Sequence, residues 1–264
     1  MPEGDTIWRT AAALQQRLSG MVVVLAWPDP IARLKGRRLL RVEPHGKHLM
    51  MHFEDRWVLH SHMRMTGSWH LYTPGQRWRK PRHLARALLR FEGAEAVLFS
   101  APVLELLRDP ATRTGHLGPD ILVDPFDLEE LLRRARASEV RTLGELLLEQ
   151  RVCAGIGNIY KCESLWIQRL DPWRSQDELV DGELAELYQV ARRLMRAALT
   201  GQGPRRRAVH ARGGRPCLRC GSPVRVRAQG AQGRLTYHCP HCQVGPGVLA
   251  RPAPNRGDAI DARG

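Results

Sequence analysis

Apolar residues recur at helical spacing at the start of the chain and again in its second half. Over residues 5–19 they follow one another at intervals of four, three and four residues, which predicts a helix that Gly20 ends. The same periodicity predicts later helices. These lie at about residues 126–137, 142–150, 157–168 and 181–199.

Between these helical regions, from residue 21 to about residue 108, the pattern changes to short apolar runs rich in branched side chains. Proline, glycine and aspartate clusters separate the runs, as is typical of strands in a sheet. We therefore predict a β-rich N-terminal domain, a sandwich introduced by one helix. The runs cover residues 22–25, 39–42, 48–53, 57–59, 84–91 and 96–99.

Turn-forming residues at Asp109-Pro110, Gly115 and Gly118-Pro119 indicate a linker, because strand-like patterning does not resume after them. A second, helical domain follows the linker. The proline- and glycine-rich end of the chain is expected to be disordered. The predicted divisions are a domain at 1–108, a linker at 109–124, a helical domain at 125–204, a basic segment with a cysteine unit at 205–243, and a tail at 244–264.

The composition of the chain points to a polyanionic partner. The 264 residues include 41 Lys plus Arg and 27 Asp plus Glu, a formal charge of +14, while 43% are hydrophobic, which excludes a fully disordered protein. No run approaches the roughly 20 apolar residues of a membrane helix, and residues 1–5 lack the pattern of a signal peptide. Because the charge does not form an amphipathic membrane helix, we expect a cytoplasmic protein that associates with nucleic acid and makes no membrane contact.

Four of the six cysteines form two Cys-x2-Cys pairs separated by 18 residues, which is the ligand spacing of a zinc ribbon. Residues 224–227 and 234–237 alternate between apolar and polar positions, like a β-hairpin between the pairs. With four thiolates no position is open to water, so one structural Zn²⁺ is expected. His238 and His241 are alternative ligands. The predicted ligands are Cys217, Cys220, Cys239 and Cys242.

Two glycines and an asparagine precede the helix predicted at 157–168. Small residues such as Gly155 and Gly157 let a phosphate approach the exposed amides at a helix N-terminus, where the helix dipole favours anions. The alternative is an ordinary turn between two helices, since glycine pairs are common in turns. The segment alone leaves both interpretations open.

Three separated motifs together resemble the formamidopyrimidine-DNA glycosylase/endonuclease VIII family. They are the start Met-Pro-Glu-Gly, the segment Gly-Ile-Gly-Asn-Ile-Tyr-x-x-Glu-x-Leu-Trp at 155–166, and Gly-Arg-Leu-Thr-Tyr-His-Cys-Pro-His-Cys-Gln at 233–243. The Pro-Glu-Gly opening looks more like the endonuclease VIII branch. The resemblance implies an α+β fold of two domains: an N-terminal helix with a β-sandwich, then a helix–two-turn–helix domain with a four-cysteine zinc ribbon.

The resemblance also implies a bifunctional DNA glycosylase and abasic-site lyase of base excision repair. Removal of Met1 would leave Pro2 with a secondary amine, of which roughly a tenth is neutral at pH 7 for a pKa near 7.7–8. Its attack on the sugar C1′ forms a Schiff base, so that base excision and strand cleavage share one intermediate. The alternative is that Pro2 and Glu3 merely start the first helix.

Further roles are carried over from the family by position. Glu3 matches the acid that assists sugar ring opening and base departure, and Lys47 matches a proton donor and phosphate contact. Arg234 matches the hairpin arginine that binds the phosphate near the lesion and is assigned to δ-elimination. Asn158 matches an asparagine that contacts the DNA backbone. For Lys47 the alternative is a solvated strand lysine.

A flipped base leaves a gap in the duplex that the protein must fill. Met65 occupies the family's gap-filling position, although buried strand methionines are also common. Its neighbour Arg64 would face the orphaned base. His116 stands at a linker position that is often a phosphate-binding arginine, and a histidine contact there weakens as the pH rises.

The chain departs from the family pattern at three further places, one of which is residues 64–66, Arg-Met-Thr, where the endonuclease VIII branch tends to have Gln-Leu-Tyr. Thr6 stands where the family usually has a glutamate, so another group must supply any hydrogen bond there. Residues 100–103, Ser-Ala-Pro-Val, contain neither the arginine nor the phenylalanine of the formamidopyrimidine branch. The gap-filling set is therefore reduced to Met65 with Arg64.

We expect a monomer that removes oxidised bases, pyrimidines first, from damaged double-stranded DNA, with single-stranded or bubble DNA as further substrates. Two alternatives remain. One is a zinc-ribbon protein that binds damaged DNA without catalysis. The other is a glycosylase that prefers 8-oxoguanine or formamidopyrimidine.

Overall fold

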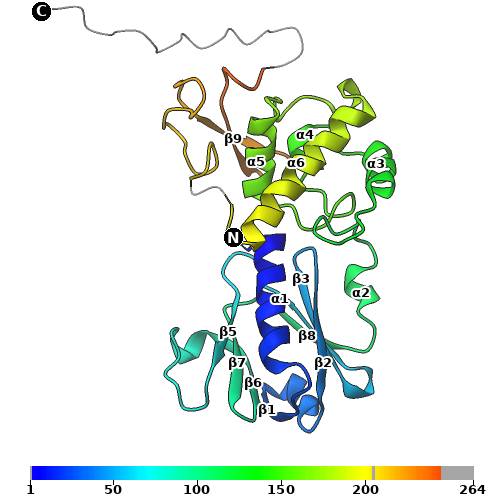
Figure 1. The fold of residues 1–264 in the computed structure, drawn as a ribbon, viewed down its shortest axis with the longest axis vertical. Helices are drawn as coiled ribbons and strands as arrows, with labels where there is room; N and C mark the ends of the chain where they lie inside the picture. The colour runs from blue at the N-terminus through cyan, green and yellow to red at the C-terminus, as the bar shows by residue number, and fades with distance from the viewer. Residues whose placement is uncertain (1, 204–205, 245–264) are drawn as a thin grey trace, which may run out of the picture.

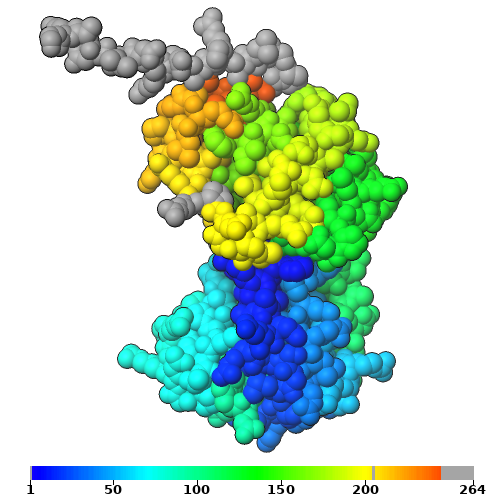
Figure 2. Space-filling model, in the orientation of Figure 1, coloured from blue at the N-terminus to red at the C-terminus, as the bar shows by residue number. Residues whose placement is uncertain are grey.

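The computed structural model describes residues 2–203 and 206–244, which form two domains joined at a narrow waist (Figures 1 and 2). The N-terminal domain contains two four-stranded sheets of antiparallel strand pairs, ordered β1-β6-β7-β5 and β2-β3-β4-β8. The apolar faces of both sheets share one core, as the predicted sandwich requires. The strands are β1 (Val23–Trp27), β2 (Leu39–His45), β3 (His48–Phe53), β4 (Val58–His62), β5 (Ser68–Tyr72), β6 (Ala85–Phe91), β7 (Ala94–Phe99) and β8 (Val103–Leu107).

Strands β5 and β8 lie outside the runs that the sequence pattern singles out. All five residues of β8 are half-buried at the edge of its sheet, so Val-Leu-Glu-Leu-Leu shows no clear inside–outside alternation. In β5, only Trp69 and Tyr72 are buried. Edge strands with partly buried positions give a weak pattern, which explains why these two are hard to recognise.

Helix α1 (Gly4–Leu18) connects the sandwich to the second domain. Its predicted apolar positions are buried in the core of the sandwich, while Trp8 packs against the core of the second domain. Figure 1 shows the N-terminal end of α1 at the waist, next to α6. The first residues of the chain are therefore fixed between the two domains.

The second domain contains α3 (Leu128–Ala137), α4 (Leu143–Leu146), α5 (Asn158–Ile167) and α6 (Asp181–Leu199) around a core of its own. The predicted helix over 142–150 is wrong beyond Leu146. There the backbone changes to tighter bonds between residues three apart, from the Leu148 amide to Glu145 (2.9 Å) and from the Glu149 amide to Leu146 (3.1 Å). This turn directs the chain into the cleft described below.

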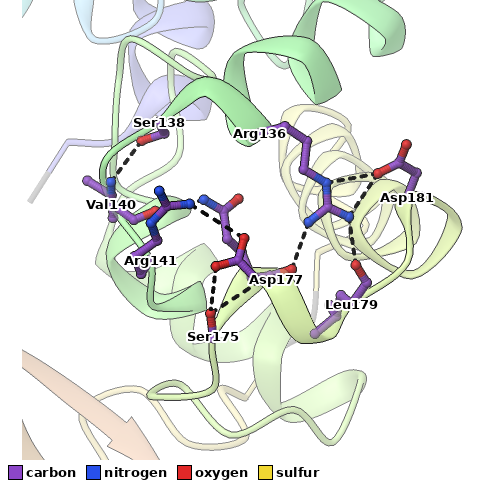
Figure 3. Close-up of polar contacts among 9 residues, drawn as sticks. Arg136, Ser138, Val140, Arg141, Ser175, Asp177, Leu179 and Asp181 are labelled. Carbon is purple, nitrogen blue, oxygen red and sulfur yellow. Dashed lines mark hydrogen bonds and ion pairs between the residues drawn. The ribbon is translucent and has the colours of Figure 1, made fainter.

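A group of polar contacts fixes α3 against the start of α6 (Figure 3). The guanidinium of Arg136 donates to the carbonyls of Gln176 (2.8 Å) and Leu179 (2.6 Å) and to the carboxylate of Asp181 (2.9 Å). Gln176 begins the 3-10 turn Gln176–Glu178, and Leu179 follows directly after it. Arg136 therefore satisfies groups that the turn between the helices leaves without helical partners.

The predicted linker contains one helical turn, α2 (Ala111–Thr114), and ends inside the second core at Ile121 and Leu122. The buried carboxylate of Asp120 joins three segments there. It accepts hydrogen bonds from the Trp8 indole (3.1 Å), the Gly46 amide (2.7 Å) and the Leu122 amide (2.8 Å). Asp120 thus connects α1, the β2–β3 turn and the second domain.

The C-terminal hairpin, β9 (Arg225–Gln229) and β10 (Arg234–His238), packs against α5. The fold class predicted from the sequence is confirmed: an α+β protein with a helix and sandwich followed by a helical domain and a cysteine ribbon. The predicted disordered tail lies outside the described residues, apart from Val244. In the described ranges, no helix is both long and apolar enough to span a bilayer.

Candidate catalytic site and nucleic-acid interface

A cleft of about 590 Å³ opens between the two domains and the hairpin. Residues that lie far apart in the sequence line it together. The sequence-predicted residues on its wall are Pro2, Lys47, Arg64, Met65, His116, Asn158 and Arg234. The remaining predicted catalytic residue, Glu3, lies behind the wall and is buried.

The carboxylate of Glu3 occupies the N-terminus of α5. It accepts hydrogen bonds from the amides of Ile159 (2.8 Å) and Tyr160 (3.5 Å), whereas it makes no cap to its own helix α1. A residue that merely started the first helix would have no reason to reach across the domain boundary. Burial raises the pKa of Glu3, although the Ile159 amide and the charge of Lys47 counteract part of this effect.

This arrangement changes the phosphate site predicted at the start of α5. The amides of Ile159 and Tyr160 already bind a carboxylate from the protein itself, at the end of the helix where the dipole favours an anion. Gly157 is needed because a Cβ at this position would lie 2.2 Å from Cδ of Glu3. The small residues therefore make room for Glu3.

Lys47 lies in the two-residue turn between β2 and β3. Gly46 has a φ of +57°, a conformation that favours glycine, and its amide is bound by Asp120. The Lys47 ammonium donates to the carbonyl of Ile156 at 2.5 Å, and the side-chain amide of Gln150 donates to the same oxygen at 3.1 Å. Burial lowers the pKa of Lys47 to about 8, with the negative charge of Glu3 opposing the shift.

Asn158 and Arg234 join the helical domain to the hairpin. The Asn158 side-chain amide donates to the carbonyl of Leu235 (2.8 Å), next to Arg234 on β10. Its Oδ1 is buried without a hydrogen-bond partner in the described residues. Arg234 is exposed on the cleft wall, and its charge is close enough to Lys47 to lower the pKa of that lysine further.

A buried polar network under Arg234 was not anticipated from the sequence. Lys161 of α5 is fully buried and donates to the hydroxyl of Thr236 (2.7 Å), which donates to Gln229 Oε1 (2.8 Å). Gln229 stands opposite Arg234 in the hairpin and donates to the carbonyl of Pro172. A helix lysine and a strand threonine usually indicate solvated positions, so no local signal reveals this network.

The predicted gap-filling residues lie on the turn between β4 and β5. Met65 has an exposed fraction of 61%, whereas its neighbour Met63 is buried, so Met65 is not a core methionine. Arg64 is exposed with a φ of +47°. The hydroxyl of Thr66 donates to the carbonyl of Ser100 (3.0 Å), so the 100–103 segment supports this turn. His116 is exposed on the same cleft.

The four predicted zinc ligands cluster in the ribbon. Their sulfur atoms all lie within 4.8 Å of one another, and neither His238 nor His241 belongs to the group. The Trp166 indole donates to Cys217 Sγ (3.3 Å) and the Cys242 amide donates to Cys239 Sγ (3.4 Å), as expected for sulfur atoms that carry negative charge. The donor set fits the one structural Zn²⁺ predicted from the sequence. Through Trp166, the metal site is connected to α5.

Comparison with known proteins agrees with this geometry. Residues 1–102 match the family model of the formamidopyrimidine-DNA glycosylase N-terminal domain, and residues 117–208 match that of the formamidopyrimidine-DNA glycosylase H2TH domain. A probable endonuclease 8 2 from Streptomyces coelicolor is 42% identical over 262 residues, covering 93% of this chain and 95% of that protein. The chain belongs to the formamidopyrimidine-DNA glycosylase/endonuclease VIII family.

Other family members support the same assignment. Endonuclease 8 2 from Mycobacterium bovis is 32% identical, covering 92% of this chain and all of that protein. The formamidopyrimidine-DNA glycosylase of Thermus thermophilus is 34% identical, and the match covers 92% of this chain and 98% of that protein. A solved structure of the Lactococcus lactis glycosylase, bound to DNA containing an abasic site, shares the fold with a TM-score of 0.79 at 23% identity, covering 92% and 99%. This family consists of DNA glycosylases of base excision repair.

The position of Lys47 predicts how the reaction depends on pH. Because the pKa of Lys47 is lowered to about 8, its ammonium group is protonated below that pH and loses its proton as the pH rises further. We expect kcat/KM for base excision, which reports groups of the free enzyme, to fall above pH 8. In Lys47→Arg the guanidinium stays protonated, so the upper limb of the profile should move upward by at least ~1 pH unit, with a lower maximum rate.

The lower limb of the same profile is the internal control, because Lys47→Arg replaces no other ionisable group. An upper limb that stays in place in this variant would show that Lys47 does not set it.

The contact between Gly157 and Glu3 gives a second prediction. In Gly157→Ala the added Cβ would displace the Glu3 carboxylate from α5, so single-turnover excision should fall by about 100-fold or more. Zinc content should stay near that of the natural protein, and single-turnover rates taken at saturating enzyme do not depend on a change in DNA affinity. The matched control is Gly182→Ala in α6, whose Cβ would meet nothing within 4 Å. Equal activity in the two variants would contradict a catalytic role for the buried carboxylate.

Proposed function

We propose that this protein is a bifunctional DNA glycosylase and abasic-site lyase that acts through a Schiff base on Pro2. The observation that carries the proposal is the meeting of Pro2, Lys47 and Arg234 on one cleft wall, with Glu3 buried directly behind it. These residues come from the start of α1, the β2–β3 turn and β10, yet Pro2, Lys47 and Arg234 face one space open to a nucleotide. A carboxyl group buried beside Pro2 is a group that a reaction at this amine would use as a proton donor or acceptor.

In the proposed reaction the neutral secondary amine of Pro2 attacks C1′ of the damaged nucleotide. The bond between C1′ and the base breaks, and the base leaves with its electron pair and takes up the proton that the Pro2 nitrogen loses. As the sugar ring opens, its oxygen takes a proton and C1′ remains attached to the Pro2 nitrogen as an iminium ion. Glu3, whose pKa is raised by burial, is suited to supply that proton at neutral pH.

Strand cleavage then follows from the same intermediate. Loss of a proton from C2′ expels the 3′-phosphate, which is the β-elimination, and a second elimination expels the 5′-phosphate. Lys47 and Arg234 supply positive charge on the cleft wall where the phosphates would bind, which favours the departing anions. Water finally releases the sugar fragment from Pro2 and restores the amine.

The exposed methionine on the β4–β5 turn fits the other requirement of this chemistry. A base reaches an active site only after it leaves the helical stack, and an apolar side chain such as Met65 can fill the gap that remains. Arg64 and His116 would contact the surrounding DNA from the same wall of the cleft. Damaged double-stranded DNA is therefore the proposed substrate.

Borohydride trapping tests the nucleophile. With Met1 removed, the natural protein should form a covalent adduct with a duplex that contains an abasic site. A protein whose N-terminus is blocked by a permanent tag should form none, and Pro2→Gly should cleave far more slowly while binding the duplex with similar affinity.

The DNA affinity of each variant, measured in parallel, separates loss of chemistry from loss of binding. Binding without any adduct in the natural protein would favour a zinc-ribbon protein that recognises damaged DNA without cleaving it. Cleavage that is unchanged in both variants would mean that Pro2 is not the nucleophile.

For the lesion, we propose oxidised pyrimidines as the preferred bases. The Streptomyces coelicolor and Mycobacterium bovis relatives, both named as endonuclease 8, support this preference. The Thermus thermophilus relative, named as a formamidopyrimidine-DNA glycosylase, supports the second candidate, a preference for 8-oxoguanine or formamidopyrimidine. A panel of single-lesion duplexes should give faster single-turnover excision of oxidised pyrimidines than of 8-oxoguanine opposite any base. The reverse order would establish the second candidate.

A further inference from the structure

The segment between β5 and β6 is strongly basic and is not part of the cleft. Residues 76–83 read Gln-Arg-Trp-Arg-Lys-Pro-Arg-His, and one more arginine follows at the start of β6. We call residues 76–86 the basic loop. Its exposed arginines are Arg77, Arg79, Arg82 and Arg86.

These arginines have no acidic partner within the described part of the chain. Elsewhere on the same sheet Arg90 pairs with Glu95 at 2.7 Å, and across the molecule many other arginines pair in the same way. A cluster of like charges without neutralising partners repels itself and gains stability when an anion binds. The basic loop therefore carries charge that the fold itself does not use.

Aromatic packing holds the basic loop in one conformation. The Trp78 ring lies 6.4 Å from the ring of Tyr72 and 5.8 Å from that of Phe99 between ring centres, and the guanidinium of Arg82 stacks over Trp78 at 5.4 Å. The Arg79 amide donates to the Tyr72 hydroxyl (3.1 Å). The charges are thus presented from an ordered platform, which lowers the entropy lost when a partner binds.

The basic loop is continuous with the turn that carries the gap-filling methionine. Lys80 donates to the hydroxyl of Ser68 (2.8 Å), only three residues from Met65. Ser100, whose carbonyl binds Thr66 of that turn, also contacts the end of the loop, because its amide donates to the Leu84 carbonyl (2.8 Å). In Figure 1 the segment after β5 projects from the same side of the molecule as the zinc ribbon.

We propose that the basic loop is a second DNA-backbone surface, which binds phosphates of the duplex beyond the lesion on the side of the N-terminal domain. This inference rests on the proposed function. Exposed arginines on an ordered loop next to the gap-filling turn can reach phosphates of a duplex that lies in the cleft. Such contacts carry no sequence information, so they lengthen the binding site and position the duplex while leaving lesion choice to the cleft.

The test is the salt dependence of binding to an undamaged duplex. The triple variant Arg77→Gln, Arg79→Gln, Arg82→Gln should bind more weakly at physiological salt. The plot of log affinity against log salt concentration should become less steep by about two to three, since each phosphate contact contributes roughly 0.9. Trapping at saturating abasic-site DNA should proceed at the natural rate, because no cleft residue is changed.

A matched control removes the same charge from exposed positions outside the basic loop: Arg17→Gln, Lys35→Gln, Arg56→Gln. Its salt slope should stay within experimental error of the natural protein. Equal slopes in the two triple variants would overturn the proposal. It would also be overturned if the basic-loop variant lost affinity for structured RNA and kept it for duplex DNA.

Failure of the proposed function gives a different result. A natural protein that binds duplex DNA through the basic loop but forms no borohydride adduct would contradict the Pro2 chemistry and leave the surface intact.

Discussion

The carboxylate of Glu3 at the N-terminus of α5 is the interaction on which the arrangement of the site depends. One side chain from the sandwich domain accepts hydrogen bonds from two backbone amides of the helical domain, which a helix N-terminus would otherwise leave without partners. The same contact brings Pro2 to the cleft and leaves the carboxyl group buried, which raises its pKa. The contact between Glu3 and α5 therefore both joins the two domains and sets the environment of the N-terminal residues.

Other buried polar groups also join segments that are far apart in the sequence. Asp120 joins α1 and the β2–β3 turn to the helical domain, and Lys161 joins α5 to the hairpin through Thr236. Buried polar groups are costly unless every donor and acceptor is paired, so such contacts allow one relative position of the segments and disfavour others. The predicted zinc site is joined to the helical domain as well, because Cys217 accepts a hydrogen bond from Trp166 of α5. The contacts of Asp120, Lys161 and Trp166 together fix the segments that form the cleft wall.

The sequence predicted the parts of this protein that depend on local patterns. The spacing of the cysteines indicated the ribbon, and apolar periodicity placed α1 and α6 to within one residue. Glu3 and Lys47 were found through the family resemblance. The anchoring roles of Asp120 and Lys161 were missed, because each depends on partners more than 70 residues away. The basic loop was missed for a related reason: its unpaired charge becomes evident only when all neighbouring acids are located in space.

The carbonyl of Ile156 has a consequence for how the free protein meets its substrate. It accepts hydrogen bonds from both Lys47 and Gln150. When the Lys47 ammonium turns toward an incoming phosphate, Gln150 still satisfies this oxygen, so no acceptor is left bare in the protein interior. Breaking the hydrogen bond between Lys47 and Ile156 would therefore leave no buried carbonyl without a donor.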